Sequence, residues 1–205
     1  MNGLEIGRLL RAANTGCVVG CRVTQLGALA FGGMVRIPLD DAYQVFGLIT
    51  DIHIADDGLV RQLVTYEDVP ADVILDNRVN RNVPVEISVL FVGFEQAGRI
   101  SHLLPPSPPL TLDVMYACSP GEMRTFLSSG RFGYLRHVLR SLDLPVGELL
   151  AAHLQQAAAA MPAEWLQAAM QELITLLRDD YATLMSVLGA LSDIHLPDST
   201  PGGAQ

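Results

Sequence analysis

The chain has 205 residues with 22 acidic and 13 basic side chains, which gives a formal net charge of −9. All basic residues are arginines, because the sequence contains no lysine, so a standard P-loop and Schiff-base chemistry are both excluded. The negative charge disfavours binding to a nucleic-acid backbone, and no uninterrupted apolar stretch reaches the roughly 18 to 20 residues that a membrane span needs.

The start of the chain and its cysteines indicate a cytoplasmic protein. Residues 1–11 lack the cationic start, apolar middle and small-residue cleavage site of a signal peptide. The cysteines, Cys17, Cys21 and Cys118, are odd in number, which argues against a disulfide framework. Cys17 and Cys21 have no nearby residue that completes a metal spacing, so we expect both to be small apolar fillers of a strand. We expect no metal and no other cofactor.

The first half of the chain predicts β-structure. Short runs rich in Val, Ile, Leu and Phe alternate with turn-forming residues such as Gly32-Gly33 and Asp40-Asp41. Asp56-Asp57-Gly58 is typical of a hairpin turn, because a glycine after aspartate adopts the positive φ that a tight turn requires. Several short strands at this spacing indicate a small barrel. The predicted strands are Cys17–Thr24, Met34–Pro38, Tyr43–Ala55, Leu59–Tyr66 and Pro84–Glu95, with an excursion of mixed polarity from Glu67 to Asn82.

A proline-rich segment separates this half from the rest. Residues 103–110 read Leu-Leu-Pro-Pro-Ser-Pro-Pro-Leu. Four prolines in five positions cannot form a helix or a central strand, so we predict a stiff, extended connector. The predicted domains are a barrel with a proline-rich exit over residues 1–112 and a helical domain over residues 113–195.

The helical domain is predicted to contain four to five helices. Ser119-Pro120-Gly121-Glu122 is a capping box with proline at the first helical position, so we expect a helix that begins at Pro120 and ends at Gly130. Apolar residues at helical spacing predict further helices over about 132–142, about 146–160 and from Pro162 onward, with a break near residue 179. Residues 196–205 are small and polar, and we expect them to be disordered. The predicted fold class is α+β, a small N-terminal β-barrel followed by helices.

The densest cluster of catalytic residue types is Asp51, His53, Asp56 and Asp57. On a strand, Asp51 and His53 would share a face, which would suit a metal-dependent hydrolase. The turn geometry alone explains Asp56 and Asp57. No nucleophile elbow, zinc-protease helix or dinucleotide-binding loop occurs in the sequence. We therefore expect no catalytic residues and no enzyme.

An arginine-rich segment is the best candidate for partner binding. Between Met123 and Leu142 there are four arginines and one histidine but no acidic residue. In a chain of net charge −9, such a segment suits an acidic partner or a phosphate. The alternative, an ordinary solvated face paired with acids from other helices, is the more common situation for such a segment. The candidate partner-binding residues are Arg124, Arg131, Arg136, His137 and Arg140.

The barrel half resembles a known domain. The motifs are Gly7-Arg8-Leu9, Gly27, Gly32-Gly33-Met34-Val35, residues 45–52, Val85 to Gly93, Gly98-Arg99-Ile100 and the prolines. Together they resemble the HAS-barrel, the small N-terminal β-barrel of HerA-type DNA translocases and ATP synthase subunits. The resemblance covers roughly the first 127 residues. The translocases continue into a P-loop motor, whereas this chain continues into predicted helices without any lysine. The resemblance therefore implies the assembly element of that family without its ATPase.

These observations predict a non-catalytic adaptor that docks through its barrel onto a protein partner or onto copies of itself as a homo-oligomer. The resemblance implies a hexameric HerA-type DNA-processing ATPase as the context. We expect no direct contact with nucleic acid or a membrane. Two alternatives stay open: a PRC-barrel-like docking module, which residues 47–58 resemble, and a metal-dependent hydrolase that uses Asp51, His53 and Asp56.

Overall fold

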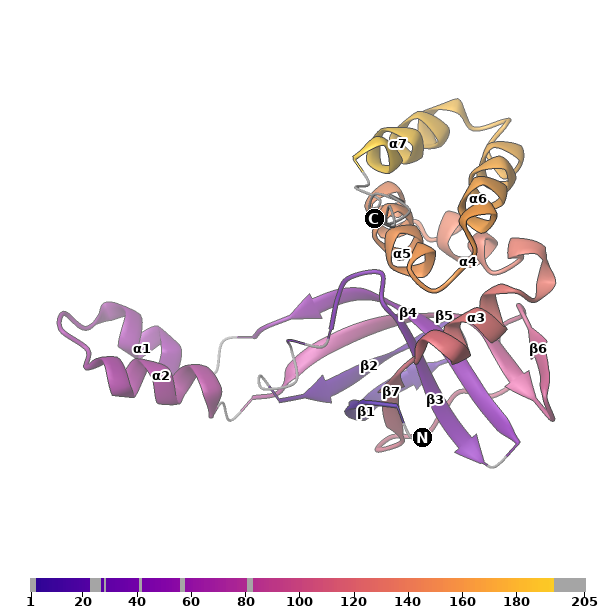
Figure 1. The fold of residues 1–205 in the computed structure, drawn as a ribbon. Coiled ribbons are helices and arrows are strands. Elements are labelled where there is room, and N and C mark those ends of the chain that lie inside the picture. Colours follow the sequence, from indigo (N-terminus) through magenta and orange to yellow (C-terminus); the bar gives the residue numbers. More distant parts are fainter. Residues whose placement is uncertain are drawn as a thin grey trace, which may run out of the picture.

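The structure is a computed structural model, and it describes residues 3–22, 27, 29–40, 42–55, 58–80 and 83–193. An antiparallel β-barrel forms the N-terminal part, and five α-helices follow it in sequence (Figure 1). The predicted α+β architecture is therefore confirmed. Two further α-helices are inserted between the fourth and fifth strands. Among the described helices, none is long and apolar enough to cross a membrane.

Six strands of the described chain close the barrel. Around the wall they run β2, β1, β7, β3, β4 and β5, and the pairing of β2 with β5 completes the ring. Every pairing is antiparallel, and β6 is attached only to the end of β5. The strands are β1 (Glu5–Ala13), β2 (Gly16–Cys21), β3 (Met34–Asp40), β4 (Tyr43–His53), β5 (Val85–Gln96), β6 (Arg99–Ser101) and β7 (Val114–Ala117).

The predicted strand Leu59–Tyr66 is wrong. Leu59–Thr65 forms helix α1, and β4 pairs with β5 instead of with a strand that follows Gly58. The apolar residues in this run come in pairs four residues apart, which is the spacing of a helix face. Helix α2 (Ala71–Val79) lies within the stretch of mixed polarity from Glu67 to Asn82, which is predicted to be an excursion between strands. Of the predicted turn, Asp56 and Asp57 lie outside the described residues, as does Asp41 of the earlier turn.

The barrel extends past residue 112. Strand β7 lies beyond the prolines, yet it pairs with both β1 and β3 and so supplies part of the wall. The proline-rich segment is a loop within the barrel rather than its exit. The side-chain amide of Asn14 donates to the carbonyl of Pro105 at 2.9 Å, and the backbone N–H of Leu112 donates to Leu9 at 2.9 Å. These bonds hold the loop against the β1–β2 hairpin.

The barrel wall is buried on both sides where the C-terminal helices cover it. In β4, Val45 and Ile49 belong to the core inside the barrel, whereas Phe46 and Leu48 belong to a second core shared with the helices. Cys17 and Cys21 are buried in the inner core as free thiols, which confirms their prediction as small apolar fillers. The helices therefore pack on the outer wall of their own barrel.

The C-terminal helices begin with the predicted capping box. The Ser119 hydroxyl accepts from the Glu122 backbone N–H at 3.3 Å, and the Glu122 carboxylate accepts from the Ser119 backbone N–H at 2.8 Å. The helix predicted over 132–142 is shorter, because residues 130–132 form a turn with positive φ values of 64°, 46° and 58°. The helices are α3 (Pro120–Leu127), α4 (Leu135–Leu139), α5 (Val146–Ala158), α6 (Ala163–Leu176) and α7 (Tyr181–Ser192). The expected disordered tail, residues 196–205, lies outside the described chain.

A buried histidine joins the barrel to the helices. His153 on α5 is fully buried, and burial lowers its pKa to about 4, so the imidazole is neutral. Its Nδ1–H donates to the Gly32 carbonyl at 3.2 Å, and its Nε2 accepts from the Tyr134 hydroxyl at 3.1 Å. Gly32 has a φ of 78°, and a Cβ added to it would lie 2.7 Å from the backbone nitrogen of His153. Glycine is therefore required here for both conformation and close approach.

Candidate functional site

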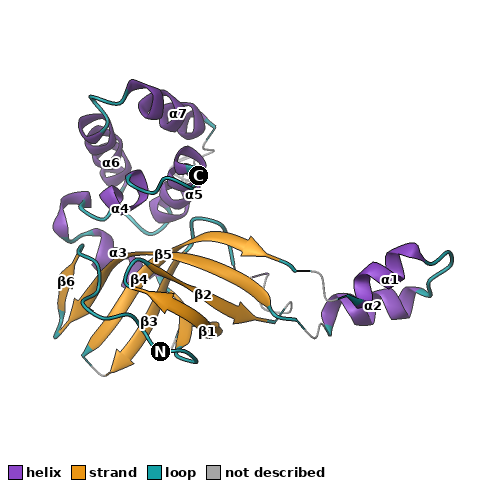
Figure 2. Cartoon of the chain, turned by 180° about the vertical axis from the view of Figure 1, so that it is seen from behind, coloured by secondary structure: helices purple, strands orange, loops and turns teal. Residues whose placement is uncertain are grey.

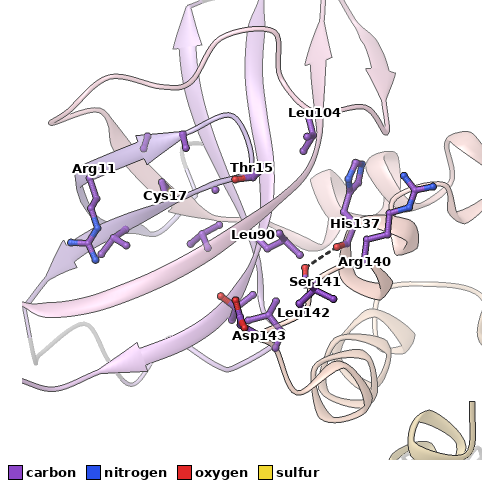
Figure 3. Close-up of a pocket in the computed structure, with 17 residues that line it drawn as sticks. Arg11, Thr15, Cys17, Leu90, Leu104, His137, Arg140, Ser141, Leu142 and Asp143 are labelled. Atoms are coloured by element: carbon purple, nitrogen blue, oxygen red, sulfur yellow. Dashed lines mark hydrogen bonds between the residues drawn. The ribbon is translucent and has the colours of Figure 1, made fainter. Parts of the chain in front are cut away.

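A cleft of about 720 Å³ lies between the barrel and the loop that joins α4 to α5 (Figure 3). The β1–β2 hairpin and the wall residues Thr50, Val89 and Leu90 form its barrel side, and Leu104 of the proline-rich loop contributes at the rim. The opposite side is formed by residues 140–144 together with His137. The cleft thus combines segments from both ends of the sequence.

The cleft has an apolar lining with cationic groups at its edge. Arg140 is exposed on the helical side, and Leu142 beside it is 97% exposed. Arg11 lies on the barrel side, where its guanidinium is 3.6 Å from the carboxylate of Glu86. Asp143 is the acidic residue among those that line the cleft. This arrangement suits a segment that carries both apolar side chains and a negative charge.

His137 holds the cleft wall in place. Its Nε2–H donates to the His102 carbonyl at 2.8 Å, and the Ser141 hydroxyl donates to the His137 carbonyl at 2.9 Å. Burial lowers the pKa of His137, and the nearby guanidinium of Arg136 adds to this effect. The ring therefore contributes a hydrogen-bonded, largely neutral surface to the cleft.

The structure places the five candidate partner-binding residues in different environments. Arg136 donates to the same His102 carbonyl as His137, and the Arg124 side chain donates to the Ala160 carbonyl at 2.9 Å near the end of α5. These contacts stabilise the chain itself. Arg131 is exposed in the left-handed turn, and Arg140 is exposed at the cleft. The segment is therefore not one continuous face, and the cleft brings together only His137 and Arg140.

The hydrolase alternative finds little support in the described chain. Asp51 and His53 are both exposed on β4. No group of three His, Cys, Asp or Glu side chains that could hold a metal occurs among the described residues, while Asp56 lies outside them. Burial raises the pKa of Cys17 to about 12 and raises that of Cys118 as well. These two cysteines are therefore neutral thiols, which are poor nucleophiles.

Sequence reasoning missed most of the cleft. Arg11, Leu104 and Leu142 line it, yet none of them belongs to a recognisable motif. Among these three residues, a local sequence signal is present at Leu142. It lies in the loop between a short helix and the proline that precedes the next helix.

The fold and cleft define a class of protein: a closed six-stranded antiparallel barrel with a helical cap and, between them, a mainly apolar cleft whose lining includes Arg11, Arg140 and Asp143. No protein-family model matches the sequence, and no curated protein is significantly similar to it. The HAS-barrel resemblance therefore rests on the sequence motifs alone.

Proposed function

We propose that the chain is a non-catalytic adaptor that binds an acidic, partly apolar segment of a partner protein in the cleft between its barrel and its helices. The observation that supports this function is the position of Arg140 and Leu142, which expose a charge and an apolar side chain at the same cleft edge. In a chain of net charge −9, the exposed guanidinium of Arg140 at the cleft edge favours an acidic partner.

The resemblance to the HAS-barrel suggests the class of the partner. In that family the barrel serves assembly and a separate motor hydrolyses ATP. This chain has no lysine for a P-loop, so an ATPase partner would have to supply the motor. We therefore propose a hexameric HerA-type DNA-processing ATPase as the partner that the adaptor serves.

The test is a binding titration of the full chain with the purified HerA-type ATPase of the same organism, measured by calorimetry. We expect a complex that Arg140→Glu weakens at least tenfold, because the reversal places a negative charge opposite an acidic segment. Arg178→Glu is the matched control, since Arg178 is also exposed but lies at the end of α6 and does not line the cleft. Its affinity should stay within twofold of the wild type.

The two parts of the proposal fail separately. If no complex forms with the ATPase, the proposed partner is wrong. If a complex forms and Arg140→Glu binds as tightly as Arg178→Glu, the cleft is not the docking site.

A further inference from the structure

Helices α1 and α2 project from the barrel as a hairpin that ends far from the other helices (Figures 1 and 2). No residue of α2 is buried. Six large apolar residues of this hairpin are exposed, although Val, Ile and Leu are among the residue types most often buried. They are Val64, Tyr66, Val73, Ile74, Leu75 and Val79.

Such short helices need packing to be stable. The helices have 7 and 9 residues, whereas isolated helices shorter than about 12 to 15 residues are marginal in water. Neither helix has a side-chain cap at its N-terminus. Their stability must therefore come from tertiary contacts, and the described chain does not bury α2.

We propose that this hairpin joins two copies of the chain by packing against the same hairpin of a second copy as a four-helix bundle. The proposal deepens the proposed docking function, since it names one partner of the adaptor as the chain itself. Val73, Ile74 and Leu75 are consecutive, so they span about 200° around the axis of α2. A helix that is apolar over so much of its circumference needs neighbours on more than one side. The second hairpin supplies two helices at once, whereas a single partner helix in a groove would cover one face.

The exposed area matches what a dimer needs. The exposed fractions include 79% for Val64, 68% for Tyr66 and 62% for Leu75. Summed over the six residues, with main-chain and polar atoms included, the exposed surface is on the order of 600 Å². A standard interface buries about 800 Å² per partner, of which about 65% is apolar in homodimers. The exposed surface of one hairpin is therefore of the same order as one side of such an interface.

The charges of the hairpin also permit self-association. Its described residues include Arg61 and Arg78 as well as Glu67, Asp68, Asp72 and Asp76. Four acids against two arginines leave a net charge of −2 on these residues of each copy, so a two-fold arrangement has to place acids of one copy near arginines of the other. A membrane surface fits less well, because interfacial helices usually carry many cationic residues on the polar face.

The test measures the mass of the full chain by light scattering after size exclusion, from 1 to 100 µM. We expect a species of twice 22.1 kDa, and a monomer for the double variant Val64→Asp/Leu75→Asp. A second variant replaces residues 55–84 with an Asn-Gly turn. Because His53 pairs with Glu86 across β4 and β5, such a turn can join the two strands directly. This variant should be folded by circular dichroism and monomeric by light scattering.

The matched control is Leu110→Asp, since Leu110 is 73% exposed on the proline-rich loop. It should dimerise like the wild type. A wild-type chain that is monomeric at 100 µM, or a turn-replaced chain that still dimerises, would overturn the proposal. The proposal would also be overturned by a monomeric chain that co-floats with anionic phospholipid vesicles and no longer does so when the hairpin is replaced by the turn. None of these results bears on the ATPase titration, because none of the altered residues lines the cleft.

Discussion

The molecule has two helical regions, and their apolar residues are buried in one region and exposed in the other. In α5 and α6, residues such as Leu154, Trp165 and Leu173 are buried in a core shared with the barrel wall. In α1 and α2, residues such as Val64 and Leu75 are exposed. Leucine occurs in both regions, whereas valine is frequent in α1 and α2 and alanine is frequent in α5 and α6. The difference lies in what each helix packs against, and each prediction below tests one side of that contrast.

The largest effect is expected where the C-terminal helices meet the barrel. Phe126 on α3 is fully buried, and its ring centroid lies 4.7 Å from that of Phe46 and 4.7 Å from that of His102. Phe126→Ala should lower the free energy of unfolding by about 3–5 kcal/mol, because it removes a large side chain and leaves a cavity. Urea denaturation followed by tryptophan fluorescence measures this loss. An effect below about 1 kcal/mol would mean that the helices do not pack on the barrel in solution.

The next effect is a loss of stability in mild acid, centred on His153. Burial holds its pKa at about 4 in the folded chain, against an ordinary value near 6.5 when unfolded. Below pH 6.5 the unfolded chain therefore binds the proton first, and stability falls as the pH is lowered towards 4. Between pH 7 and pH 5 the expected loss from this group is about 2 kcal/mol. Burial also lowers the pKa values of His102 and His137, which contribute with the same sign.

Urea unfolding of His153→Gln at pH 7 and pH 5 tests this assignment. The difference in unfolding free energy between the two pH values should be smaller in this variant by about 2 kcal/mol, even if the variant is less stable at both. His53→Gln is the control, since His53 is exposed on β4 and its replacement removes a histidine without opening the core. An equal change in unfolding free energy between pH 7 and pH 5 for the wild type and both variants would contradict a neutral, buried His153.

The sequence predicted those parts of the fold whose signals are local. The capping box at Ser119 and four of the strands follow from side-chain chemistry and spacing within a few residues. Strand β7 has only 4 residues and is defined by its neighbours β1 and β3, so no local pattern reveals it. The cleft was missed for the same reason, because Arg11 and Leu142 become neighbours of one cavity only after the barrel closes.

A smaller effect is expected at the point where the chain leaves the barrel for the helices. Ser119 caps α3 through the hydrogen bond with the Glu122 backbone, and the Glu122 carboxylate also lies 2.6 Å from the guanidinium of Arg36 on β3. Ser119→Ala should cost about 1 kcal/mol, the usual value of an N-cap. Thermal unfolding measures it. Ser107→Ala, on the exposed proline-rich loop, should leave the midpoint unchanged, and equal midpoints for both variants would contradict the cap.

The smallest effect on the single chain is expected in the projecting hairpin. Leu75 is 62% exposed, so Leu75→Ala removes almost no buried contact within one copy and should change the unfolding free energy by less than about 0.5 kcal/mol. This holds only where the chain is monomeric. At concentrations well above the dimer dissociation constant, association stabilises the folded wild type by mass action, and the variant should then unfold at lower urea than the wild type. A gap between the two proteins that grows with concentration therefore assigns Leu75 to an interface, whereas a gap that is large and constant would assign it to a core within the chain.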